Sequence, residues 1–308
     1  MEPIKGISSS KLIRFSYFAF TALLAASLPV SRTFISVFQF GLAGIFILEG
    51  IRVQSYLAFY QNYKLPALII RFIPFHLQVI FAAIAKQFRR IVRNRLFLAF
   101  ILFSAVYLTG MIYTTDFADG LRVLRKMLPI FLLPLFFTGI GSFSKEEKNI
   151  ILLFFVLSAS VSSLISTGIF LSGQYDDIRR ISPFISHIHL AVFIDYAVFI
   201  LFYFMRLVIT GKKMKLAAAA WMLWLIIFQV FILKSLTGVV ILLAGAYFIL
   251  CLPKRFRVQI NSIARFALII IIPAAILSVL THAALKFYHV EDLNPDQLEH
   301  YTAQGNPY

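Results

Sequence analysis

The feature that most limits how this chain can fold is its succession of long, nearly uncharged apolar runs. About 20 apolar residues in a helix cross a bilayer, whereas the strands of an outer-membrane barrel alternate over about ten residues. The runs in this chain are long and do not alternate. We therefore predict an all-α, polytopic transmembrane bundle of about nine spanning helices, at residues 12–30, 33–49, 96–113, 127–143, 149–171, 188–208, 216–233, 237–252 and 264–282.

The composition agrees with a membrane-embedded chain. Hydrophobic residues make up 60% of the 308 residues and charged residues only 14%. The mean hydropathy is +0.88. A chain of this length and apolarity is not a water-soluble globule. Its single cysteine, Cys251, excludes an internal disulfide and says little about function.

The net charge of +16 would suggest nucleic acid as the partner of a soluble protein. Here, however, the lysines and arginines gather in short segments between apolar runs, which is the positive-inside pattern of membrane proteins. With the N-terminus in the cytoplasm, the basic segments 212–215 and 254–257 fall in the cytoplasm as well. We therefore expect no nucleic-acid partner.

Residues 65–95 are not expected to cross the membrane. If they did, their dense basic cluster would lie outside, against the positive-inside pattern. At about 100° per residue, Arg71, Arg89 and Arg93 fall within an arc of about 80°. This spacing predicts one amphipathic helix on the inner leaflet, in contact with anionic lipid through Arg89, Arg90 and Arg93. A tilted or re-entrant span is the alternative.

The chain then divides into a transmembrane helical domain over residues 1–282 and the start of a periplasmic loop over residues 283–308. The polar segments 31–32, 114–126, 172–191 and 234–238 are expected on the same outer side as that loop. Candidate functional residues are therefore sought in these outer segments.

The polar segment RRISPFISHIHLA, residues 179–191, stands between two long apolar runs. Its arginines, Arg179 and Arg180, are expected at the level of the outer lipid headgroups. Because a guanidinium binds phosphate through two parallel N–H groups, the pair is suited to a lipid diphosphate. Pairing with the neighbouring Asp176 and Asp177, or with lipid headgroups, is an equally good interpretation.

The same segment carries two histidines, His187 and His189, and an aspartate, Asp195, follows in the next apolar run. Histidine titrates near neutral pH and can act as a general acid or base, although an ordinary interfacial histidine is the commoner outcome. No Cys and carboxylate cluster accompanies the histidines, so we predict no metal site. An ionised carboxylate inside a membrane needs a partner, and we expect Asp195 to orient the outer site by pairing with His187, Arg179 or Arg180. A structural hydrogen bond is the alternative.

The outer turn KSLTG supplies Lys234 and Ser235 as candidate substrate contacts. Thr237 can contribute to binding or cap the next helix, and Gly238 lets another backbone or a substrate approach. The alternative is a helix hairpin turn with a snorkelling lysine.

Arg122 and Arg125 form a third candidate group, because their spacing places them on one side of a short outer helix. They could guide an anionic substrate or rest on lipid phosphates. The sequence contains no Walker loop, dinucleotide fingerprint, nucleophile elbow or zinc motif, so no cofactor is expected.

Four segments share their order and their expected membrane side with one family. They are YTTDFADGLRVLRKMLPIFLLPLFF (113–137), RRISPFISHIHLA (179–191), KSLTGVVILL (234–243) and YTAQGNPY (301–308). Together they resemble the O-antigen ligase and polymerase family, and most of all its Bacteroidetes branch. Each segment is weakly specific, so the resemblance rests on their combination.

The resemblance implies an enzyme of the bacterial inner membrane that acts at the periplasmic face in lipopolysaccharide biosynthesis. Such an enzyme transfers a glycan from undecaprenyl or another polyprenyl diphosphate to lipid A core or a similar sugar acceptor, without a metal or nucleotide. It also implies that Arg179, Arg180 and Lys234 hold the diphosphate, and that His187 and His189 shape the acceptor side.

Two departures from the family pattern concern the site. Many members have Ser-Arg-Ser/Thr-Gly where this chain has Ser235-Leu236-Thr237-Gly238, so Lys234 would take the place of the arginine. His189 stands where an arginine is expected. Members also continue through a large periplasmic loop with further catalytic Arg and His residues, and this chain is expected to stop at the start of that loop.

Two other functions fit the sequence. One is the related polymerase, which joins repeat units on the carrier. The other is a polytopic transporter or lipid exporter, which a continuous polar pathway past Asp195 would favour.

Overall fold

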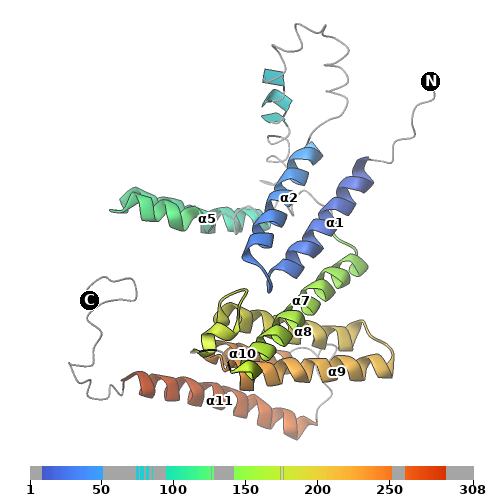
Figure 1. The fold of residues 1–308 in the computed structure, drawn as a ribbon, viewed down its shortest axis with the longest axis vertical. Coiled ribbons are helices and arrows are strands. Elements are labelled where there is room, and N and C mark those ends of the chain that lie inside the picture. Colours follow the sequence, from blue (N-terminus) through green and yellow to red (C-terminus); the bar gives the residue numbers. More distant parts are fainter. Residues whose placement is uncertain are drawn as a thin grey trace. The chain divides into compact units, whose positions relative to one another are not determined.

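The computed structural model describes residues 9–50, 95–125, 142–173, 177–251 and 261–288, together with the single residues 127 and 175 and with 74–75, 77–79, 81–82 and 85. The regular elements of this described part are all helical (Figure 1). The main ones are α1 (Ser9–Ser27), α2 (Arg32–Gly50), α5 (Arg95–Tyr113), α7 (Lys145–Ser172), the 3-10 helix η1 (Ile178–Ile181), α8 (His187–Leu207), α9 (Lys212–Ile227), the π-helix η2 (Phe228–Leu233), α10 (Leu236–Cys251) and α11 (Ser262–Tyr288). The prediction of an all-α chain is confirmed for these residues.

Five of the described helical stretches are long and apolar enough to cross a membrane. They are Arg32–Glu49, Lys145–Ser172, His187–Leu207, Lys212–Leu233 and Arg265–Leu285. By helix length and hydropathy, the chain is therefore a multi-pass membrane protein.

The full count of nine spans stays a prediction. Two further apolar stretches of the described part, Leu102–Tyr113 and Leu236–Cys251, are shorter than a typical span. The expected span 127–143 and the expected interfacial helix within 65–95 fall almost entirely outside the described residues.

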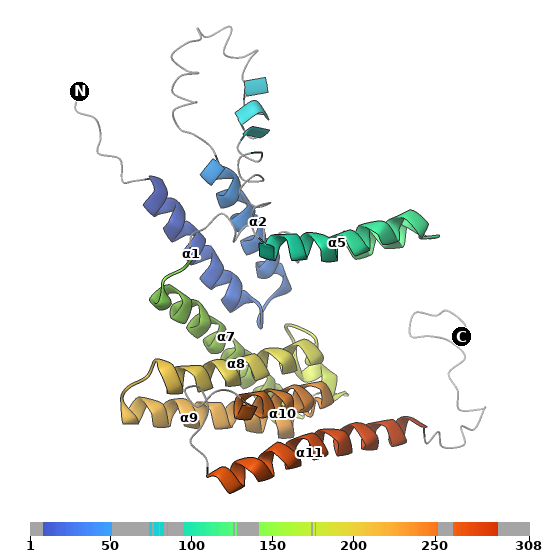
Figure 2. The same cartoon turned by 180° about the vertical axis from the view of Figure 1, so that it is seen from behind.

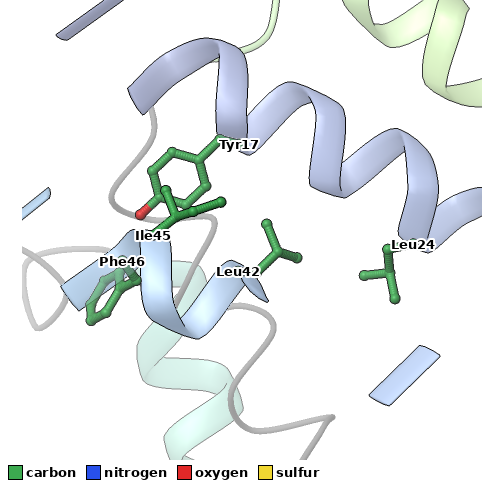
Figure 3. Packing of buried hydrophobic residues seen from close by; sticks show 5 residues of the cluster. All are labelled: Tyr17, Leu24, Leu42, Ile45 and Phe46. Carbon is green, nitrogen blue, oxygen red and sulfur yellow. The ribbon is translucent and has the colours of Figure 1, made fainter. Parts of the chain in front are cut away.

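The chain divides into two compact units. One consists of Met1–Ile169 with Ser182–Ser186, and the other of Phe170–Ile181 with His187–Tyr308. In the first unit, α1 and α2 form a hairpin whose core is Tyr17, Leu24, Leu42, Ile45 and Phe46. Figure 3 shows the side chains of Tyr17 and Leu24 on α1 directed towards α2.

The start of α7 carries a capping box that follows from its sequence. The backbone N–H of Glu147 donates to Ser144 Oγ at 3.1 Å, and the N–H of Ser144 donates to Glu147 Oε2 at 2.6 Å. This reciprocal pair satisfies two donors that a helix start leaves free. Arg14 of α1 also reaches Glu147 Oε2 at 3.0 Å, which links two elements of the first unit.

In the second unit, α8 packs against α9 and α10, and α10 also packs against α11 (Figures 1 and 2). Gly238 and Gly245 are seven residues apart and share one face of α10. A Cβ on Gly245 would overlap the ring of Phe199 of α8. Small residues thus let α10 approach α8 closely, as is common between membrane helices.

Some helix bounds differ from the predicted ones. The last helix, α11, continues to Tyr288, beyond the predicted end at 282, because Ala and Leu after the apolar window are good helix formers. Pro273 lies inside α11 without ending it. The predicted span 216–233 begins earlier, at Lys212, and its last six residues form η2.

Candidate functional site

The second unit brings together four of the predicted site residues, which we call the basic cluster: Arg179, Arg180, His187 and Lys234. The two arginines lie in η1, His187 begins α8, and Lys234 directly follows η2. Because η1 lies against both α8 and η2, these positions from separate segments meet in one region. The arginines of η1, the start of α8 and the residues after η2 thus belong to neighbouring elements of the second unit.

Asp177 organises the arginine end of this cluster. Its carbonyl accepts the N–H of Arg180 at 2.9 Å, and its Oδ1 accepts the N–H of Arg179 at 2.9 Å. The Arg179 side chain also lies 4.0 Å from Asp177 Oδ2. Both arginines are exposed, whereas Ile181 is buried and anchors η1. An exposed ion pair of this kind is weak, so an anionic ligand can replace Asp177 as the partner of Arg179.

His187 connects α8 to the end of η2. Its Nε2 is hydrogen-bonded to the carbonyl oxygen of Leu233. Because a carbonyl oxygen only accepts, Nε2 is the donor and Nδ1 is the ring nitrogen that can accept a proton. The half-buried ring thus ties the turn before Lys234 to the start of α8 and still offers a proton acceptor.

Lys234 has a left-handed backbone, with φ at 51°. This conformation costs a residue other than glycine roughly 1–2 kcal/mol. The N–H of Lys234 donates to the Gln229 carbonyl at 3.1 Å, and the side chain is exposed. This hydrogen bond therefore fixes the backbone of Lys234 at the end of η2 and leaves its side chain exposed.

The cap of α10 corrects one prediction. The helix begins at Leu236, so Thr237 lies inside its first turn and is exposed. The buried Ser235 precedes the helix instead, and its Oγ accepts the N–H of Gly238 at 3.4 Å. The cap is thus Ser235 and not Thr237, because the turn ends one residue earlier than the sequence suggested.

Asp195 does not make the expected pair with His187, Arg179 or Arg180. Its carboxylate is fully buried, and neither oxygen has a hydrogen-bond partner among the described residues. Eight residues separate it from His187, about 12 Å along a helix. The spacing of a straight helix therefore prevents the predicted contact with His187. His189 is exposed and points away from His187, as a helical separation of two residues requires.

Arg122 and Arg125 belong to the first unit, and both are exposed. Arg122 forms an ion pair with Asp119 at 3.0 Å. A hollow of about 280 Å³ lies beside this segment and is lined by Tyr107, Gly110, Met111, Thr114, Thr115, Asp116, Asp119, Gly120, Val123 and Leu124. Neither arginine lines it.

Gln229 is a site residue that the sequence analysis missed. It is fully buried in η2, and its amide would overlap a Cβ on Gly238. The signal in the sequence was a lone glutamine inside the apolar run 225–233. A polar side chain in such a run is costly unless it has a function or a partner.

No protein-family model matches the chain, and neither the curated proteins nor the solved structures contain a match. A function for this chain therefore has to be argued from the geometry of the basic cluster and from the order of its polar segments.

Proposed function

We propose that this protein is a membrane glycosyl-transfer enzyme of the O-antigen ligase type. It would move a glycan from a polyprenyl diphosphate carrier to lipid A core or a similar sugar acceptor. The observation that carries the proposal is the meeting of η1, the start of α8 and the turn after η2, which groups Arg179, Arg180, His187 and Lys234.

The chemistry of this reaction needs positive charge beside the leaving group. As the acceptor hydroxyl oxygen bonds to the anomeric carbon, the bond from that carbon to the carrier diphosphate breaks and leaves negative charge on the diphosphate. Two exposed guanidinium groups and the ammonium of Lys234 suit that charge. The proton of the acceptor hydroxyl would pass to Nδ1 of His187, with His189 beside the acceptor.

The proposal includes a topology. The N-terminus lies in the cytoplasm, nine helices cross the bacterial inner membrane, and the basic cluster lies on the periplasmic side. The exposed basic residues Lys212, Lys213 and Lys215 at the start of α9 support this, because they would then lie in the cytoplasm. Residues 65–95 would rest on the inner leaflet, with Arg89, Arg90 and Arg93 against anionic lipid.

The double variant Arg179→Ala with Arg180→Ala tests the proposed function. We expect glycan transfer in membranes to fall at least about 100-fold, because two groups that stabilise the leaving diphosphate are lost. Transfer is measured as glycan attached to the lipid acceptor on a gel, at equal amounts of membrane-inserted protein.

The double variant Lys212→Ala with Lys213→Ala is the matched control. It removes the same two positive charges from an exposed helix start on the proposed cytoplasmic side. It should retain transfer. Full activity of the arginine variant, or an equal loss in both variants, would overturn the proposal.

A further inference from the structure

Two polar side chains of the second unit are fully buried and have no hydrogen-bond partner among the described residues. Asp195 lies in α8 and Gln229 in η2, and both have an exposed fraction of 0%. Both carboxylate oxygens of Asp195 and both polar atoms of the Gln229 amide are unpartnered. Buried polar groups are normally hydrogen-bonded, because leaving them unsatisfied costs free energy. Two buried side chains that both lack a partner indicate that a ligand binds between them.

Both side chains belong to one packing junction. η2 lies against α8 and α10, and α10 lies against α8. A Cβ on Gly238 would overlap the Gln229 amide and would lie 3.1 Å from the Cβ of Ala191. Asp195 is one helical turn beyond Ala191, and both are buried, so they share one face of α8. The carboxylate and the amide thus enter the same junction from two elements.

Among the described residues, the Asp195 carboxylate has no hydrogen-bond partner, and no ion pair is found for it. On α8, the nearest basic residues in sequence are His189 and Arg206, six and eleven residues away and both exposed. These separations correspond to about 9 and 16 Å along a helix. The other ionisable side chains on the described elements packed here are Arg179 and Arg180 of η1, His187, Tyr196 and Tyr203 of α8, Lys212, Lys213 and Lys215 of α9, Lys234 after η2, and Tyr247 and Cys251 of α10. An isolated buried charge is expensive, so a positive species has to accompany it.

We infer that Asp195 and Gln229 form an internal site for a small monovalent cation, either Na⁺ or a proton. The carboxylate supplies the negative charge, and the amide oxygen supplies a second oxygen ligand of the kind that hard cations take. The two side chains are not hydrogen-bonded to each other. A cation between them can therefore satisfy the carboxylate of Asp195 and the amide oxygen of Gln229.

The site is linked to the turn that carries Lys234. The Gln229 carbonyl accepts the N–H of Lys234 at 3.1 Å. A cation bound to the Gln229 side chain therefore also restricts the motion of Gln229, whose carbonyl holds the turn at Lys234. The cation site itself does not depend on the proposed glycosyl transfer, because it uses different atoms in a buried place.

The experiment measures the thermal unfolding midpoint of the detergent-purified protein while NaCl replaces choline chloride at constant ionic strength. We expect Na⁺ to raise the midpoint of the wild type, because a ligand of the folded state stabilises it. Asp195→Asn should abolish this response. Gln229→Leu should need at least about tenfold more Na⁺, as the loss of one good ligand contact predicts. Glu146→Gln removes an exposed carboxylate and is the matched control.

A series at different pH values distinguishes the two cations. If the occupant is a proton, Na⁺ has no effect, and the wild-type midpoint falls as the pH rises because the folded state holds the proton more tightly. Asp195→Asn should then lose that pH dependence. The inference is overturned if Asp195→Asn responds to Na⁺ and pH as the wild type does, or if the wild type responds to neither.

A second measurement needs no variant, and it tests cation binding at Asp195 even if Asp195→Asn does not fold. A hydrophobic carbodiimide modifies protonated carboxyl groups in apolar sites, and peptide mapping identifies the modified residue. We expect Asp195 to react, and either Na⁺ or a higher pH to protect it. Absence of reaction at Asp195, or a rate that neither condition changes, would contradict the inference.

Discussion

Gly238 lies where α10 meets the amide of Gln229 and the methyl group of Ala191. A methyl group there overlaps the Gln229 amide, so the helix or the glutamine has to shift. We predict that Gly238→Ala lowers the free energy of unfolding by about 1–3 kcal/mol, as overpacking of a core does. The midpoint of thermal unfolding in detergent measures the change.

The control for this substitution is Gly168→Ala in α7, where an added Cβ would meet nothing within 4 Å. That change should raise the free energy of unfolding by about 0.5–1 kcal/mol, because alanine loses less conformational entropy in a helix. Combining Gly238→Ala with Gln229→Ala should recover most of the loss, since the overlapping amide is then gone. Equal effects of the two single glycine substitutions would show that the close approach at Gly238 is not real.

At the scale of elements, the start of α7 gives a prediction about helix capping. Ser144→Ala removes the oxygen that accepts the N–H of Glu147. We expect the free energy of unfolding to fall by about 1 kcal/mol, the usual cost of losing an N-cap. Ser142→Ala, two residues earlier and exposed, should have no measurable effect. Chemical denaturation followed by circular dichroism compares the two, and equal stability of both variants would contradict the cap.

The helices themselves were predictable because their signals are local. The length and apolarity of the run at 149–171 predicted a spanning helix, and the structure has α7 at Lys145–Ser172. The π-helix η2 was not predictable from the sequence. Residues 225–233 are apolar apart from Gln229, so the extra residue of a π turn shifts no polar face and leaves no sign in the pattern. The junction of Asp195 with Gln229 depends on how helices far apart in sequence pack, which no local pattern encodes.

The same distinction applies to the basic cluster. The sequence predicted that the segments with Arg179, Arg180, His187 and Lys234 lie on the same outer side of the membrane, and the family resemblance implied that these residues share a site. It did not predict the bond between His187 and the Leu233 carbonyl, which requires the end of η2 to lie beside the start of α8. The expected pairing of Asp195 with His187 was wrong, because eight residues of helix place the two about 12 Å apart along α8.

At the scale of the whole molecule, the membrane topology makes a prediction that the stretch formed by α9 and η2 can test. The stretch Lys212–Leu233 has 22 residues, about 30 Å of helix, which matches the thickness of a bilayer core. In a Cys251→Ser background, Lys213→Cys and Thr237→Cys place single thiols at exposed positions on either side of it. A membrane-impermeant maleimide should label Thr237→Cys in intact spheroplasts and Lys213→Cys only after permeabilisation.

The same background separates the two interpretations of residues 65–95. With a cytoplasmic N-terminus and two spans before residue 65, Asn94→Cys lies inside if 65–95 rests on the inner leaflet, and outside if that segment crosses. We expect Asn94→Cys to be labelled only after permeabilisation, like Lys213→Cys. Labelling of Asn94→Cys from outside would make 65–95 a span. Labelling of Lys213→Cys and Thr237→Cys from the same side would instead show that Lys212–Leu233 does not cross. If both thiols are labelled only after permeabilisation, the basic cluster does not lie on the periplasmic face.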